Sequence, residues 1–149
     1  MVKELRAHER LRLELARVLL VDDDPASRLT LQTVLRAGGY RVDAAASASE
    51  AVSKLDESEY ELVLTDLHME SPESGLKVLA HARLMDYKPA TALITTYRDA
   101  RRTKSSNKKT SPTVLIEPED LPALLTKVAD MVSERATRRV QRGLKHGAY

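Results

Sequence analysis

Three consecutive carboxylates, Asp22–Asp24, follow an apolar run in the stretch RVLLVDDDPASR (17–28), and a second apolar run, 60–66, also ends in an acid, Asp66. Adjacent like charges repel and raise one another's pKa. Carboxylates gathered without cysteine suit a hard cation such as Mg²⁺, which prefers oxygen ligands and offsets that repulsion. A carboxylate beside Mg²⁺ can also attack a phosphoryl group to form an acyl phosphate.

Elements that alternate between strand and helix would position these acids. Short apolar runs predict strands, helical spacing of apolar residues predicts the segments between them, and Ser47 and Glu50 are spaced as a capping box. Such alternation predicts an α/β fold with a parallel sheet and helices on both faces. The five predicted strands are 16–23, 40–47, 60–66, 91–97 and 112–118, and the predicted helices include 74–86 and 119–140.

Side chains that carry oxygen fall at the carboxyl ends of four of the predicted strands. In an open α/β sheet the ligand crevice lies outside the carboxyl ends of the strands, so we expect these groups to share one rim. They are Asp22 and Asp23, Asp66, Thr95 with Thr96 as a rival one residue on, and Glu117.

These stretches resemble the receiver domain of bacterial two-component response regulators. VLLVDDDPASR is similar to the family's first-strand signature, LVLTDLHM to its phospho-acceptor strand and ALITTYRDA to its fourth strand. The resemblance runs from about residue 16 to about residue 132. It implies a flavodoxin-like, doubly wound, five-stranded parallel sheet with strand order 2-1-3-4-5.

The resemblance also implies roles for individual residues. Asp66 would be the phospho-acceptor, and Asp22, Asp23 and Asp66 would hold Mg²⁺ together with the backbone carbonyl of His68. Thr95 would be the hydroxyl that follows the phosphoryl group. The expected function is a signalling module that receives its phosphoryl group from a sensor histidine kinase or phosphotransfer protein. Its only catalysis would be its own phosphoryl transfer and hydrolysis, so we do not expect an enzyme.

Three departures from the family pattern bear on this function. Glu117 stands where the family has a lysine before a proline, and Val114 replaces the switch aromatic residue. Residues 98–111 offer almost no apolar side chains, so the fourth helix is expected to be degenerate or disordered. Because a further carboxylate would repel a phosphoryl group, we hypothesise that phosphorylation of Asp66 is slow, short-lived or absent.

Simpler explanations exist for the same residues. Asp22–Asp24 could serve as acids at a helix N-terminus, where the macrodipole favours them. Thr95 could be a buried strand residue, and Glu117 could turn to solvent. Because Glu117 and Val114 replace the family's lysine and switch aromatic residue, one alternative function is a phosphorylation-independent pseudo-receiver that acts as a protein-binding adaptor.

Charge is distributed unevenly along the 149 residues. Residues 18–97 carry 7 basic and 13 acidic side chains, a balance of −6, whereas residues 98–109 have a balance of +5 and residues 134–149 of +4. The basic loop and tail suggest a second alternative, binding to nucleic acid or an anionic surface. No aromatic residue is interleaved with these basic runs, so bases would have no side chain to stack on, and the sequence does not favour nucleic-acid binding.

The remaining composition restricts location and domain organisation. Cysteine is absent, which excludes thiolate chemistry, and no apolar run approaches the length of a membrane span. We therefore expect no membrane association and a cytoplasmic protein, and the family resemblance implies a bacterial one. The expected organisation is an N-terminal extension, helical in part, over 1–15, a receiver domain over 16–132 and a basic extension of the last helix over 133–149. A thin stripe of Val132, Ala136, Val140 and Leu144 in that extension could pair with a second copy in a homodimer.

Overall fold

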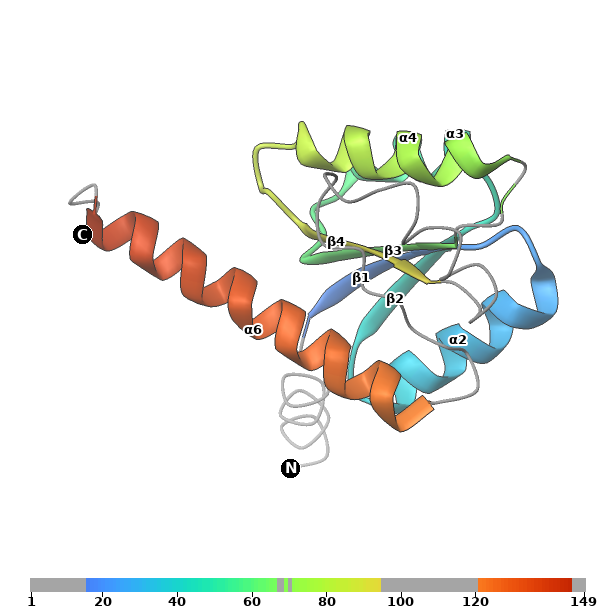
Figure 1. The fold of residues 1–149 in the computed structure, drawn as a ribbon, viewed down its shortest axis with the longest axis horizontal. Helices are drawn as coiled ribbons and strands as arrows, with labels where there is room; N and C mark the ends of the chain where they lie inside the picture. Colours follow the sequence, from blue (N-terminus) through green and yellow to red (C-terminus); the bar gives the residue numbers. More distant parts are fainter. Residues whose placement is uncertain (1–15, 67–68, 70, 95–120, 146–149) are drawn as a thin grey trace, which may run out of the picture.

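The computed structural model describes residues 16–66, 69, 71–94 and 121–145. Within them, strands and helices alternate as the sequence predicts (Figure 1). In chain order the elements are β1 (Arg17–Val21), α2 (Pro25–Ala37), β2 (Arg41–Ala45), α3 (Ala48–Glu57), β3 (Leu62–Asp66), α4 (Pro72–Arg83), β4 (Ala90–Ile94) and α6 (Leu121–Lys145).

The four described strands form one parallel sheet in the order β2-β1-β3-β4. The predicted α/β class and the order 2-1-3-4 are thereby confirmed. The predicted fifth strand, 112–118, and the predicted degenerate helix over 98–111 lie outside the described residues.

Helices cover both faces of the sheet, with α3 and α4 on one side and α2 and α6 on the other (Figure 1). Alternate side chains of β1 enter the two cores: Val18 and Leu20 pack on the α2–α6 side, and Leu19 and Val21 on the α3–α4 side. All four are fully buried. Burial on both faces explains why this strand is a continuous apolar run rather than an alternating one.

Side-chain caps fix where α2 and α3 begin. The carboxylate of Asp24 accepts a hydrogen bond from the amide of Ser27 at 2.9 Å, with Pro25 in the first turn. The Ser47 hydroxyl accepts one from the amide of Glu50 at 3.1 Å, as the capping-box spacing predicts, and the Glu50 carboxylate accepts one from the amide of Ala46, the residue before the cap, at 2.6 Å. Asp24 therefore has a structural role that its two neighbouring acids do not share.

Two helices have bounds that differ from the expected ones. Helix α4 begins two residues earlier than predicted, at Pro72, because a proline is well tolerated in the first turn. It ends at Arg83, since the following amides turn back to carbonyls three residues earlier. Helix α6 runs for 25 residues to Lys145. None of the described helices is both long and apolar enough to cross a bilayer.

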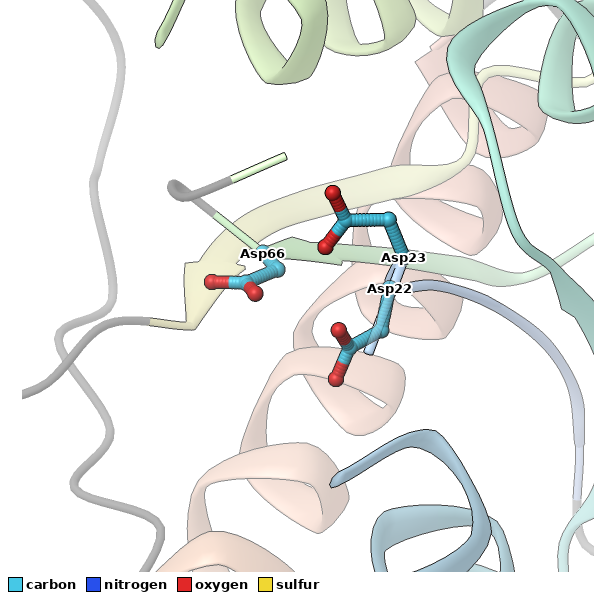
Figure 2. Close-up of side chains that lie close together, drawn as sticks. All are labelled: Asp22, Asp23 and Asp66. Carbon is cyan, nitrogen blue, oxygen red and sulfur yellow. The ribbon is translucent and has the colours of Figure 1, made fainter. Parts of the chain in front are cut away.

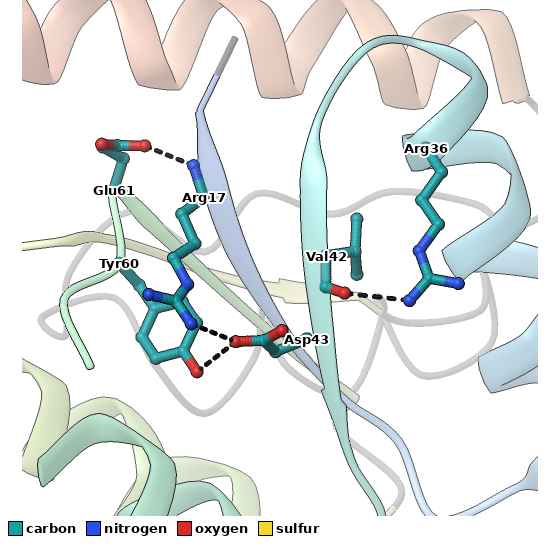
Figure 3. Close-up of polar contacts among 6 residues, drawn as sticks. All are labelled: Arg17, Arg36, Val42, Asp43, Tyr60 and Glu61. Atoms are coloured by element: carbon teal, nitrogen blue, oxygen red, sulfur yellow. Dashed lines mark hydrogen bonds and ion pairs between the residues drawn. The ribbon is translucent and has the colours of Figure 1, made fainter. Parts of the chain in front are cut away.

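A polar network joins β1, β2 and the segment before β3 (Figure 3). The Asp43 carboxylate accepts hydrogen bonds from the Arg17 guanidinium at 3.0 Å and from the Tyr60 hydroxyl at 2.7 Å. Burial alone would raise the pKa of Asp43, but these two hydrogen bonds and the charge of Arg17 outweigh it, so the pKa lies below its ordinary value. The network ties three segments together at one end of the sheet.

Candidate functional site

The pairing of β1 with β3 positions the acids at the carboxyl ends of the strands. Val21 lies opposite Thr65 in the parallel register. One residue further along, Asp22 follows the end of β1, Asp66 is the last residue of β3, and Asp23 comes directly after Asp22. Two segments more than 40 residues apart in the sequence thus deliver carboxylates to the same rim of the sheet.

The three carboxylates form one cluster, drawn in Figure 2. One carboxylate oxygen from each of Asp22, Asp23 and Asp66 lies within 4.8 Å of the others. The structure therefore brings together three of the oxygen-bearing residues that the sequence analysis placed at one rim of the sheet. This spacing allows several carboxylate oxygens to share one hard cation.

Asp22 is the most enclosed member of the cluster, at 1% exposure. Its Oδ1 accepts a hydrogen bond from the amide of Asp24 at 2.9 Å. Its Oδ2 is buried and has no hydrogen-bond partner among the described residues. Because a buried carboxylate oxygen without a partner is costly, a cation at this position would satisfy it. The donor set, all oxygen and all acidic, fits Mg²⁺.

Arg28 is a residue of this site that the sequence analysis missed. Its Nη1 donates a hydrogen bond to the backbone carbonyl of Asp22 at 2.9 Å. It reaches that carbonyl from the first turn of α2, where its own amide bonds to the carbonyl of Asp24. Arg28 therefore fixes the turn that carries the acids and adds a positive charge beside them. Its only signal in the sequence is its place in the helix that directly follows the acidic run.

Gly75 allows α4 to lie against the end of β3. A Cβ atom at this position would stand 3.0 Å from the carbonyl oxygen of Asp66, tighter than nearly all real contacts of that kind. The glycine therefore permits the close approach of α4 behind the half-buried Asp66. The remaining predicted site residues, His68, Thr95, Val114 and Glu117, lie outside the described residues.

The sequence matches the family model described as "Response regulator receiver domain" over residues 18–129. It is 30% identical over 107 residues to the transcriptional regulatory protein ZraR of Klebsiella oxytoca, covering 72% of this chain and 24% of ZraR. It is also 34% identical over 76 residues to the sensory/regulatory protein RpfC of Xanthomonas campestris, covering 51% of this chain and 10% of RpfC. The chain thus spans a quarter or less of these relatives.

Solved receiver structures share its fold. A response regulator receiver protein from Sinorhizobium medicae superposes with a TM-score of 0.70 at 26% identity, covering 83% of this chain and 98% of that one. The response regulator TrrA of Thermotoga maritima, in complex with Mg²⁺–BeF, gives a TM-score of 0.64 at 28% identity, covering 78% and 99%. The described strand order, β2-β1-β3-β4, therefore belongs to a fold that these receiver proteins share.

Proposed function

This chain belongs to the response regulator receiver domain family, and from that premise we propose that it is a two-component signalling module that accepts a phosphoryl group on Asp66. The observation that carries the proposal is the cluster of Asp22, Asp23 and Asp66, with carboxylate oxygens within 4.8 Å of one another. Asp66 is the last residue of β3, which lies between β1 and β4 in the sheet.

Asp22, Asp23 and Asp66 would hold Mg²⁺, with the backbone carbonyl of His68 as a further ligand by family resemblance. When bound, the cation neutralises charge on the carboxylates and on the phosphoryl oxygens. The unpartnered Oδ2 of Asp22 supports this assignment, since it offers a ligand atom that no described protein group already satisfies. The Mg²⁺–BeF complex of TrrA supports it by similarity.

The proposed step is a phosphoryl transfer. A carboxylate oxygen of Asp66 attacks the phosphorus atom, an oxygen–phosphorus bond forms, and the bond from phosphorus to the donor breaks. With a phosphohistidine donor the broken bond is phosphorus–nitrogen, and the electron pair leaves with the imidazole. The Asp66 carboxyl group must be ionised to attack. The hydrogen bond from Arg28 to the carbonyl of Asp22 holds the turn that carries Asp22 in place during the transfer. A sensor histidine kinase or phosphotransfer protein is the proposed donor, and signalling is by protein contact.

Glu117 should make this transfer slow or short-lived. It stands where the family has a lysine that contacts the phosphoryl oxygens, and a carboxylate there would repel them. Two unit charges about 5 Å apart repel by roughly 3 kcal/mol at an effective dielectric of 20. The proposed substitution Glu117→Lys would remove that repulsion and restore the family's charge.

Titration with Mg²⁺ and beryllofluoride, followed by amide NMR, tests the proposal. We expect Mg²⁺-dependent shifts around Asp22 and Asp66 that spread to α6. Acyl-phosphate labelling of the wild type and of Glu117→Lys gives a second test, in which the variant labels faster. Binding without spread, and no labelling of either protein, would instead indicate the pseudo-receiver function.

A further inference from the structure

A second groove lies at the other end of the sheet, between α6 and the turn that leads into β4. It has a volume of about 420 Å³ and is lined by Lys88, Pro89, Arg135, Arg138, Gln141 and Arg142. Four of its six lining residues are cationic. The phosphoryl site at the carboxyl ends of the strands does not use any of them.

Arg135 forms the floor of this groove and is 5% exposed. It donates hydrogen bonds to the carbonyls of Tyr87 at 2.6 Å and Lys88 at 3.0 Å. Its other N–H groups have no acceptor among the described residues, and no carboxylate there lies within ion-pair distance. Burial and the charges of Arg139 and Arg142 lower its pKa, which Glu61 and Glu59 offset only in part. A buried cation without a paired anion favours an anionic partner.

The sequence of α6 changes character where the helix leaves the body of the protein. Its inward face begins with the buried residues Leu124 and Val128. Arg135 lies two helical turns after Val128 on the same face, and Arg138 and Arg142 follow it at spacings of three and four residues. The second half of the helix projects past the sheet on the side where α4 ends (Figure 1). The projecting part therefore offers a row of arginines to whatever enters the groove.

An acidic corner adjoins this groove along the chain. A hollow of about 450 Å³ between the ends of α3 and α4 is lined by four acids, Asp56, Glu57, Glu59 and Asp86. Leu84, which also lines it, is 74% exposed. Tyr87 belongs to the acidic corner and Lys88 to the cationic groove, so the two patches of opposite charge are neighbours.

Neighbouring patches of opposite charge are self-complementary under a two-fold rotation. An axis that passes between them brings the acidic corner of each copy onto the cationic groove of the other. We propose that this chain forms an isologous dimer in which the acidic corner of one copy lies against the arginine-lined groove beside α6 of its partner. The exposed Leu84 would enter the groove with the acids. This surface differs from the stripe of Val132, Ala136, Val140 and Leu144 and does not depend on phosphorylation.

Charge reversal on each patch, followed by mixing, tests the proposal. The variant Arg138→Glu/Arg142→Glu leaves two cations and two acids in the groove, and Glu59→Arg/Asp86→Arg leaves two acids and two cations in the corner, so each variant cancels the net charge of its patch. Each variant alone sets a neutral patch against a charged one at both contacts. In a heterodimer of the two variants, the unaltered corner meets the unaltered groove at one contact, and the introduced acids meet the introduced arginines at the other. Arg41→Glu/Lys77→Glu changes the charge by the same amount at exposed positions outside both patches and serves as the control.

Sedimentation velocity over a range of concentrations gives the readout. We expect the wild type and the control variant to dimerise, with an affinity that falls as the salt concentration rises. Each patch variant alone should dimerise at least about tenfold more weakly. An equimolar mixture of the two patch variants should form a heterodimer. A wild type that stays monomeric in low salt would overturn the proposal, as would a dimer indifferent to both reversals or variants that fail to pair on mixing. Monomeric wild type that binds single-stranded DNA, with binding lost in Arg138→Glu/Arg142→Glu, would overturn it in favour of a nucleic-acid partner.

Discussion

Asp22 directly follows β1 and Asp66 ends the neighbouring parallel strand β3, each one residue beyond the paired residues Val21 and Thr65, and one carboxylate oxygen of each lies within 4.8 Å of the other. Asp23 completes a cluster of like charges, and Asp22 within it is almost fully buried. Such an arrangement is unfavourable for the isolated protein, because carboxylates at this separation repel by a few kcal/mol, roughly 3 at an effective dielectric of 20. A bound cation converts the same arrangement into a binding site.

The first prediction concerns stability in the absence of cations. Asp23→Asn removes one charge from the cluster and should raise the free energy of unfolding in EDTA by about 1 kcal/mol. In saturating Mg²⁺ the wild type gains binding energy that the variant loses, so the difference should shrink or reverse. Urea denaturation followed by circular dichroism in the two buffers measures this. An identical difference in both buffers would contradict the prediction.

A second prediction separates the ligands from the helix cap. Asp22→Asn should weaken Mg²⁺ binding, measured by calorimetry, by at least about tenfold, since it removes a charged ligand whose Oδ2 has no hydrogen-bond partner among the described residues. Asp24→Ser is the matched control, because serine keeps the cap of α2 while removing the neighbouring charge. Equal losses of affinity in the two variants would show that general charge, rather than the site, holds the cation.

The third prediction follows from the pKa of Asp43, which its hydrogen bonds hold below the ordinary value despite burial. A group with a lowered folded-state pKa stabilises the fold above its unfolded pKa, about 3.9 for Asp, and loses that contribution as pH falls through the folded-state value. Asp43→Asn should therefore cost about 1 kcal/mol at pH 7 and progressively less as the pH falls below about 4. Chemical denaturation across this pH range provides the measurement. A cost that stays constant from pH 7 to pH 3 would contradict it.

The fourth prediction concerns the contact between α4 and β3. Gly75→Val places side-chain atoms against the carbonyl of Asp66 and should lower the free energy of unfolding by about 2 kcal/mol. Ala80→Val introduces the same side chain at an exposed position of the same helix and should change it by less than about 1 kcal/mol. A similar cost at both positions would mean that helix propensity, not the close approach to Asp66, limits residue 75.

Much of this arrangement could be predicted from the sequence because it depends on local patterns. The apolar runs gave four strands, and the acids at their ends gave the cluster, since parallel strands place their carboxyl ends at one edge. The bounds of α4 were less predictable, because turn geometry rather than periodicity ends that helix at Arg83.

Contacts of side chains with backbone carbonyls were not predictable from one sequence. Arg28 reads as an ordinary helix residue until the carbonyl of Asp22 is placed beside it. Arg135 reads as a surface charge on an amphipathic helix, yet it is buried against the turn before β4. In each case the acceptor is a backbone carbonyl. Every residue carries such a group, so the residue types do not indicate which one accepts the hydrogen bond.

The most direct test of the central claim is the site of phosphorylation. The wild type is incubated with a small acyl-phosphate donor, with and without Mg²⁺, and the modified peptide is identified by mass spectrometry. We predict one added phosphoryl group on Asp66, formed only with Mg²⁺ and absent in Asp66→Asn, with faster formation in Glu117→Lys. Modification at another residue, or equal labelling of Asp66→Asn, would contradict the assignment of this acidic cluster as a phospho-acceptor site.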